Sequence, residues 1–252
     1  MKRSVYLSLG ILFALLLTGC ANRLPMAVDS STKKLDVSDK AVVLMTIDIK
    51  RQEKSRFTPV PFFAAVGITD GSGKLANSIQ HMEGDGYLYP TDDHAVYAFR
   101  VPVSGDSILI RNVYGQAKAF PIIGQFWVPL GMKLLVRKGE VVYAGRVEAI
   151  LRPRADHEYR AGPLFPLLDQ GVSGMSGGTF DVKVVDSFDE DMRLMREAYP
   201  ALANTPVEKR IGEVVARDIL DKEWAGNEPQ AVKTASEQSD TKPEVKEASA
   251  SQ

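Results

Sequence analysis

Apolar and polar residues alternate along much of the chain between residues 41 and 185, which is the pattern of half-buried β-strands. In the segment Ala95–Val103, Tyr97, Phe99 and Val101 fall on one side of the predicted strand, whereas Arg100 falls on the other. The other β-rich or apolar runs are Ala41–Lys50, Phe62–Thr69, Ser107–Tyr114, Phe126–Leu130, Met132–Val136, Val141–Leu151 and Gly178–Val185. Strands that follow one another about every 8 to 12 residues, with turns and no helices between them, predict an antiparallel β-sandwich or barrel.

The sequence between Met132–Val136 and Val141–Leu151 has the form of a hairpin turn. Arg137-Lys138-Gly139-Glu140 supplies a glycine at a position where a tight turn needs backbone freedom. The two flanking runs would then be neighbours in one sheet. We therefore expect a mainly β fold, an antiparallel β-sandwich, up to about residue 186.

The period of the apolar residues changes to that of α-helices after the last predicted strand. Ser187-Phe188-Asp189-Glu190 has the form of a capping box, and it predicts a helix that runs to about Tyr199 and is stopped by Pro200. A second C-terminal helix is predicted from Val207 to Trp224. The apolar stripe that would dock it on the sheets consists of Val207, Ile211, Val214 and Ile219.

The amino-terminal segment has the layout of a secretory signal. Lys2 and Arg3 precede a run of thirteen apolar or near-apolar residues from Val5 to Leu17. This run is short for a transmembrane helix, which needs about 20 residues. Leu17-Thr18-Gly19-Cys20 resembles the lipobox of bacterial lipoproteins. The resemblance implies that Cys20, rather than being a buried free thiol, carries a diacylglycerol (and a third acyl chain on its amino group) and begins the mature protein.

Lipidation of Cys20 would fix where the protein is located. Each buried methylene of an acyl chain contributes about 0.8 kcal/mol, so three chains would hold the protein on a membrane surface permanently. By resemblance to lipoprotein sorting, Ala21 permits export to the outer membrane of a Gram-negative bacterium, where an Asp would favour the inner membrane. Cys20 is the single cysteine, so no intramolecular disulfide can form even in an oxidising compartment.

The charge of the mature chain is nearly balanced. Removing Lys2 and Arg3 from the 31 basic residues leaves 29 against 32 acidic ones, which is too balanced for a nucleic-acid-binding surface.

The chain divides into five predicted segments. The end of the chain lacks aromatic residues and is rich in Ala, Ser, Thr, Glu and Lys, which is typical of disorder. The segments are a signal peptide (1–19), a lipidated tether (20–39), the β-sandwich (40–186), a helical segment (187–224) and a disordered tail (225–252).

No residue pattern meets the requirements of a catalytic site. Gly174-Met175-Ser176-Gly177-Gly178 matches the pattern around a hydrolase nucleophile, but that pattern needs a strand before the serine and a helix after it. Here a predicted strand follows Ser176, and the histidines His81, His94 and His157 all precede it. His157 itself stands within a charged cluster, predicted to lie on the surface, that comprises Arg152, Arg154, Asp156, Glu158 and Arg160.

No pattern predicts a metal or cofactor site either. Asp85, Asp92, Asp93 and His94 are interpreted as an acidic turn, because a transition metal would need more imidazole or thiolate ligands. Asp70-Gly71-Ser72-Gly73-Lys74 lacks the later ligands of a calcium loop and the setting of a phosphate loop. We therefore expect no catalytic residue, no cofactor and no metal.

The connection from Ala155 to Gly177 is long and poorly patterned, which in a compact domain is typical of a functional or mobile loop. It contains the apolar pentad Leu164-Phe165-Pro166-Leu167-Leu168. The pentad would either fold down as a lid on the core or, if exposed, contact a partner. The sequence leaves both alternatives open.

The order of features from Tyr97 to Leu151 resembles small β-sandwich lipoproteins of bacteria, similar to carboxypeptidase-regulatory or transthyretin-like modules. The motifs that carry the resemblance are Val101-Pro102-Val103-Ser104-Gly105 and Val141-Val142-Tyr143-Ala144-Gly145-Arg146-Val147. It implies the fold and an envelope location, and it supplies no catalytic residue. The expected role is non-catalytic binding or scaffolding, with membrane lipid and an envelope protein as partners. An envelope hydrolase with an unrecognised site and a structural peptidoglycan-associated lipoprotein are the alternatives.

Overall fold

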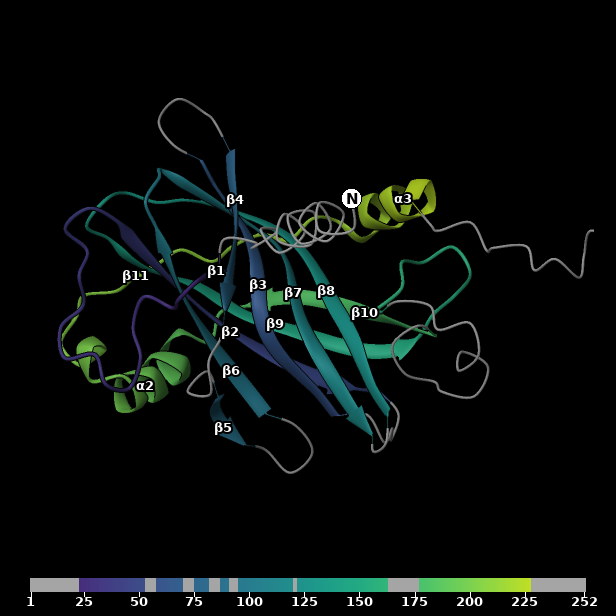
Figure 1. Cartoon of the computed structure of the whole chain (residues 1–252), viewed down its shortest axis with the longest axis horizontal. Coiled ribbons are helices and arrows are strands. Elements are labelled where there is room, and N and C mark those ends of the chain that lie inside the picture. Colours follow the sequence, from purple (N-terminus) through teal and green to yellow (C-terminus); the bar gives the residue numbers. More distant parts are fainter. Residues whose placement is uncertain are drawn as a thin grey trace, which may run out of the picture.

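The computed structural model describes residues 23–52, 58–69, 75–81, 87–90, 95–119, 122–162 and 177–227. Within these ranges the fold is mainly β, with two sheets and two α-helices (Figure 1). The signal peptide and the C-terminal tail predicted from the sequence lie outside these ranges, apart from residues 225–227. Those three residues form the end of helix α3 (Arg217–Asn227), beyond the predicted helix end at Trp224.

The strands form two sheets that we call A and B. In sheet A the strand order is β1 (Arg23–Leu24), β4 (Leu75–His81), β3 (Thr58–Thr69), β7 (Ser107–Ala119) and β8 (Ile122–Leu135). In sheet B it is β10 (Gly178–Val185), β9 (Val141–Pro153), β2 (Ala41–Arg51), β6 (Ala95–Val103) and β5 (Tyr87–Pro90), with the short β11 (Glu208–Lys209) also paired to β9.

The central strand β2 of sheet B is buried on both faces along most of its length. Val43, Met45 and Ile47 belong to the larger hydrophobic core, which also contains Val113 of β7 and Phe126 of β8 from sheet A. The alternate residues Val42 and Leu44 belong to a second core, on the opposite face of the strand. In that core they meet helix α2 (Phe188–Ala198), which contributes Met192 and Met195. A strand covered on both faces is expected to be apolar throughout, as the start of β2 is.

The prediction of purely antiparallel sheets is wrong at the centre of sheet B, where β2 and β9 pair in parallel with Val43 opposite Val142. The physical reason is topological, because strands β3, β4, β7 and β8 of sheet A lie between them in the chain. Arg137–Glu140 is accordingly a turn between sheets and not a hairpin turn. It is closed by a 3.0 Å bond from Glu140 N–H to Arg137 C=O, and Gly139 has a φ of 87°.

The region from 187 to 216 corrects two further predictions. Helix α2 has the predicted extent, but Ser187 makes no side-chain capping bond, and Asp186 Oδ1 accepts the Phe188 N–H instead. The second predicted helix is wrong over residues 207–216, because its backbone donors are used elsewhere. Residues 208–216, the C-terminal strap, run between the sheets: Gly212 N–H donates to Ala144 C=O of β9, and Val215 N–H donates to Leu130 C=O of β8.

Because residues 208–216 form the C-terminal strap, the residues that were expected to dock the second helix do not share one helical face. Val214 packs against the larger core. Ile211 is 36% exposed and Ile219, on the shorter helix α3, is 47% exposed. The predicted apolar stripe therefore does not exist as a continuous face.

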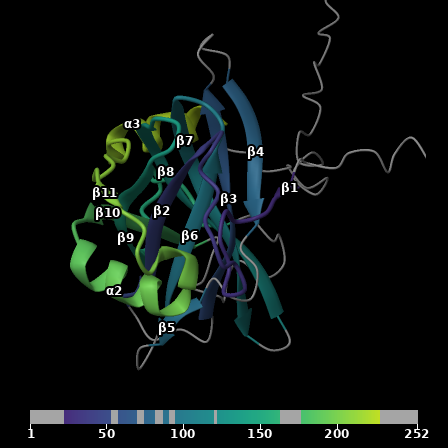
Figure 2. The ribbon, with the colours of Figure 1, turned by 90° about the vertical axis from the view of Figure 1, so that its left-hand side faces the viewer.

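The predicted tether (20–39) is packed against the body from residue 23 onward. Arg23–Leu24 pairs with β4 of sheet A, and Ala27 N–H donates to Arg100 C=O of β6 in sheet B at 2.6 Å. Val28 is 1% exposed, and Leu35 also joins the second core. We call residues 23–28 the N-terminal strap, because they connect the two sheets. In Figure 2, β1 and β4 lie on one side of the molecule and α2 lies on the opposite side.

Candidate functional site

Helix α2 is held on sheet B by a buried polar cluster around Asp191. Thr46 Oγ1 and Tyr143 OH each donate to Asp191 Oδ2 at 2.5 Å, and Arg146 donates through Nε and Nη2 to Oδ1. Asp191, Thr46 and Tyr143 are fully buried, and Arg146 also pairs with the exposed Glu190 at 3.0 Å. Burial, with the bond to Asp191, raises the pKa of Tyr143 well above its usual range.

This cluster joins α2 to sheet B, and we call its members, Thr46, Tyr143, Arg146 and Asp191, the latch. Both oxygens of the Asp191 carboxylate are bonded to donors, and water has no access to it. Buried charges are tolerated when they are paired and hydrogen-bonded in this way. The carboxylate also lies in the first turn of α2, where the helix dipole favours a negative charge. The sequence analysis missed it because its members come from three distant parts of the chain, β2, β9 and α2.

A second buried cation joins the N-terminal strap to the end of α2. Arg100 is fully buried, and its Nε donates to Val28 C=O at 2.7 Å. Its Nη1 donates to Tyr199 OH at 2.9 Å, and the guanidinium lies 4.2 Å from the centroid of the Tyr199 ring. As predicted, the alternation of β6 places Arg100 on the face opposite to Phe99 and Val101. That face is covered by α2 and by the N-terminal strap.

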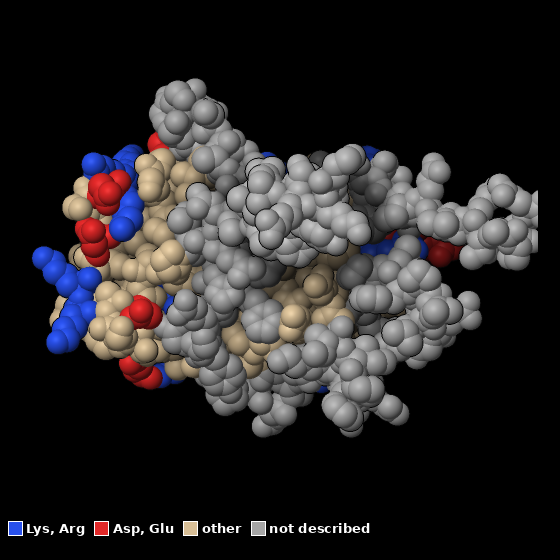
Figure 3. All heavy atoms as spheres, viewed as in Figure 1, with Lys and Arg blue, Asp and Glu red and all other residues tan. Residues whose placement is uncertain are grey.

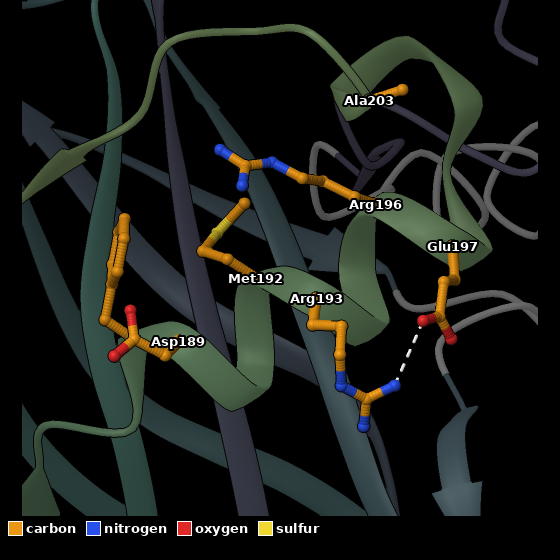
Figure 4. Close-up of a pocket in the computed structure, with 7 residues that line it drawn as sticks. Asp189, Met192, Arg193, Arg196, Glu197 and Ala203 are labelled. Atoms are coloured by element: carbon orange, nitrogen blue, oxygen red, sulfur yellow. Dashed lines mark hydrogen bonds and ion pairs between the residues drawn. The ribbon is translucent and has the colours of Figure 1, made fainter.

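The outer surface of α2 carries a pocket of about 420 Å³ (Figure 4). It is lined by the apolar side chains Phe188, Met192 and Ala203 and by the charged side chains Asp189, Arg193, Arg196 and Glu197. Arg193 Nη1 pairs with Glu197 Oε1 at 3.0 Å. In Figure 4, Met192 and Arg196 extend from the helix in the same direction, away from that pair.

Arg196 distinguishes this pocket chemically. The Arg196 side chain is exposed, and it makes no hydrogen bond or ion pair within the described part of the chain. An apolar floor next to a cation without a partner suits a ligand segment that combines an apolar group with a carboxylate. Figure 3 shows one face of the molecule, on which many of the described basic and acidic side chains gather toward the left-hand end.

Charged residues near His157 form a network with charged residues of β10 and α3. We call this network the charge cluster, and its members are Arg152, Glu158, Asp181, Arg217 and Asp221. Arg152 donates to both oxygens of Glu158, at 2.6 and 2.8 Å, and to both oxygens of Asp181, at 2.7 and 2.9 Å. Arg217 pairs with Glu158 at 3.1 Å and with Asp221 at 3.0 Å. The Arg152 bond lowers the pKa of Glu158 to about 2 against desolvation, with help from the Ala155 amide and Arg217.

The charged residues that the sequence placed in one surface cluster around His157 have different environments in the structure. Arg152 and Glu158 lie at the centre of the charge cluster, and Glu158 is 8% exposed instead of lying on the open surface. Arg154 donates to the backbone oxygens of Asp156 and Glu158. His157 is exposed, and none of the hydrogen bonds of the cluster includes its imidazole. The register of β9 and β10 could have indicated that Asp181 is a partner of Arg152, because Arg152 pairs with Thr179, which lies two residues before Asp181.

Several predicted residues lie outside the described ranges. They are Cys20, the motif of Asp70–Lys74, the acidic group of Asp85, Asp92, Asp93 and His94, the pentad Leu164–Leu168, and Ser176. Within the described ranges, no group of three or more His, Cys, Asp or Glu side chains is arranged to hold a metal ion. None of the helices in that part of the chain combines the length and apolar character needed to cross a membrane.

Comparison of the chain with protein-family models, with curated proteins and with solved structures finds no match. The resemblance of Tyr97–Leu151 to envelope β-sandwich modules therefore stays a prediction. The same holds for the lipobox at Cys20.

Proposed function

We propose that the protein is a bacterial envelope lipoprotein, anchored by acyl chains on Cys20, whose β domain serves in binding or scaffolding and not in catalysis. The observation that carries the proposal is Leu17-Thr18-Gly19-Cys20 at the end of a thirteen-residue apolar run that follows Lys2 and Arg3. With Ala21 after the cysteine, the expected anchor is the outer membrane, facing the periplasm, if the source is Gram-negative.

The domain is proposed to be a β-sandwich. The larger core contains side chains from β2, β6 and β9 of sheet B together with side chains from β3, β7 and β8 of sheet A. A single core shared by two sheets is the packing expected of a sandwich. Because β2 and β9 pair in parallel, the proposed sandwich is mixed instead of the purely antiparallel form expected from the sequence.

A binding role is supported by the way the charged side chains are used. The Asp191 carboxylate, the Arg100 guanidinium and the charge cluster around Arg152 are all paired within the domain. The α2 pocket is different, because it is open at the surface and contains Arg196. We infer that this pocket receives an envelope protein partner through a segment with apolar and acidic side chains.

The lipoprotein proposal is tested by acylation of the full chain in a bacterial host. Wild type, Cys20→Ala and Arg196→Ala chains are labelled with an alkyne analogue of palmitate, and the amino-terminal peptide is analysed by mass spectrometry. Wild type and the Arg196→Ala control should be acylated at Cys20 and retained in the membrane fraction. Cys20→Ala should give an unprocessed or soluble chain without label. An unacylated wild-type Cys20, or equal membrane retention of Cys20→Ala, would overturn the proposal.

A further inference from the structure

The covalent distance from the proposed lipid anchor to the folded body is very short. Only Ala21 and Asn22 separate Cys20 from Arg23, the first residue of β1. Three residues of fully extended chain span about 10 Å. Whatever conformation these residues adopt, the acylated cysteine lies within about 10 Å of Arg23.

The point of attachment on the body is well defined. Arg23 and Leu24 lie opposite Ile79 and Gln80 of β4, at the edge of sheet A. Immediately after them, Ala27 is hydrogen-bonded to Arg100 and the side chain of Val28 is buried. The N-terminal strap is therefore part of the domain, and it leaves no free linker after Asn22.

The thickness of the membrane interface decides what this short reach allows. A bilayer has a hydrocarbon core of about 30 Å and a total thickness of about 40–45 Å, so each headgroup layer is about 5–8 Å deep. Acyl chains on Cys20 must enter the hydrocarbon core. A reach of about 10 Å therefore carries the chain across the headgroups with only a few ångströms to spare.

We propose that the β1–β4 edge of sheet A (Arg23–Leu24 and Leu75–His81) rests against the lipid headgroup surface, so that α2 and its pocket face away from the membrane. This inference rests on the proposed lipidation of Cys20. Its structural basis is the pairing of β1 with β4 and the position of α2 on the opposite side of the molecule (Figure 2). Any partner that enters the α2 pocket then approaches from the aqueous compartment.

The single cysteine makes the orientation measurable. Once Cys20 is acylated, a cysteine introduced by Gln80→Cys or Glu197→Cys is the sole free thiol. Gln80 pairs with Leu24 at the β1–β4 edge, whereas Glu197 lines the α2 pocket. Each full-length lipidated variant is labelled with a fluorophore and reconstituted in vesicles of phosphatidylethanolamine and phosphatidylglycerol that contain lipid with a nitroxide on its headgroup.

We expect the fluorophore of the Gln80→Cys variant to be quenched several-fold more than that of the Glu197→Cys variant. A matched pair of chains carries about 20 Gly and Ser residues between Ala21 and Asn22, which adds a flexible span of about 25 Å. This insertion should bring quenching of the Gln80→Cys label down to the level of the Glu197→Cys label.

The outcomes separate the two proposals. A chain that is not acylated and does not bind vesicles overturns both the lipoprotein proposal and the orientation. An acylated, vesicle-bound chain whose two labels are quenched equally, or whose quenching is unaffected by the insertion, overturns the orientation alone. Melting of each variant, followed by circular dichroism, verifies that the substituted domains are folded.

Discussion

The hydroxyl of Tyr143 donates a 2.5 Å hydrogen bond to the carboxylate of Asp191, which lies 48 residues further along the chain. Both side chains are fully buried, one on β9 and the other on α2. The bond thus fixes the position of the helix that carries the pocket. Its strength can be measured independently of any ligand.

Replacing Asp191 should destabilise the domain strongly. Asp191→Ala removes the carboxylate that pairs with the buried Arg146 guanidinium and accepts from Tyr143 and Thr46, and we expect a loss of about 3 kcal/mol in the free energy of unfolding. Tyr143→Phe removes one bond to a charged group and should cost about 1.5–3 kcal/mol. Urea denaturation measures both. Asp189→Ala, an exposed carboxylate in the same helical turn, is the control and should change stability little. Equal stability of all three variants would contradict the latch.

The C-terminal strap should be required for a soluble domain. A chain that ends at Asn227 keeps the strap and α3, and it should melt like the full-length protein. A chain that ends at Thr205 exposes the unpaired edges of β8 and β9 and should aggregate, because open edges pair with other chains. Size-exclusion chromatography and thermal melting distinguish the two. A soluble shorter chain with an unchanged melting temperature would mean that the strap does not close the sheets.

Acid should destabilise the domain partly through Glu158. Its pKa in the folded protein is about 2, below the ordinary value of 4.5, so the folded state favours the ionised form. The stabilisation is therefore complete above about pH 4.5 and is lost as the pH falls toward 2. Glu158→Gln should lower the melting temperature at neutral pH and flatten its dependence on pH across this window. Glu197→Gln, which removes a carboxylate that is 63% exposed, should keep the wild-type dependence.

Ser176 should not behave as an activated nucleophile. It is followed directly by β10 (Gly178–Val185), whereas the hydrolase motif needs a helix at that place. We expect a fluorophosphonate probe to label wild type no more than Ser176→Ala, with a known serine hydrolase as the positive control. Specific labelling of Ser176 would instead favour the envelope hydrolase.

The sequence predicted elements well where the pattern is local. The alternation from Ala95 to Val103 gives the bounds of β6, and Gly178–Val185 is β10 as predicted. The pairing of β2 with β9 could not be predicted in the same way. These strands meet after the chain has passed through sheet A, and no local pattern records which distant strands become neighbours.

The buried polar residues were missed for a related reason. Arg100 has the periodicity of a solvent-facing position, but α2 and the N-terminal strap cover it. Asp191 lies on the buried stripe of α2, four residues before Met195, where a carboxylate is not expected without buried donors. Residues 207–216 have apolar spacing that suits a helix, yet they are extended because their amides bond to β9 and β8. One clue was present in the sequence, because Gly212 interrupts the predicted helix. In the structure a Cβ at that position would lie 2.2 Å from the Met132 sulfur, so a larger residue would displace this side chain.

The two straps also determine when the domain can become complete during synthesis. Residues 23–28 emerge first, but Arg100 and β4, which hold them, are made later. Residues 208–216, which join β8 to β9, are among the last of the domain to emerge. The partners of the N-terminal strap are available once Arg100 has been made, whereas the β8–β9 side of the body stays open until nearly the whole domain has been synthesised. The connectivity of the chain therefore makes the final closure of the two sheets a late event in synthesis.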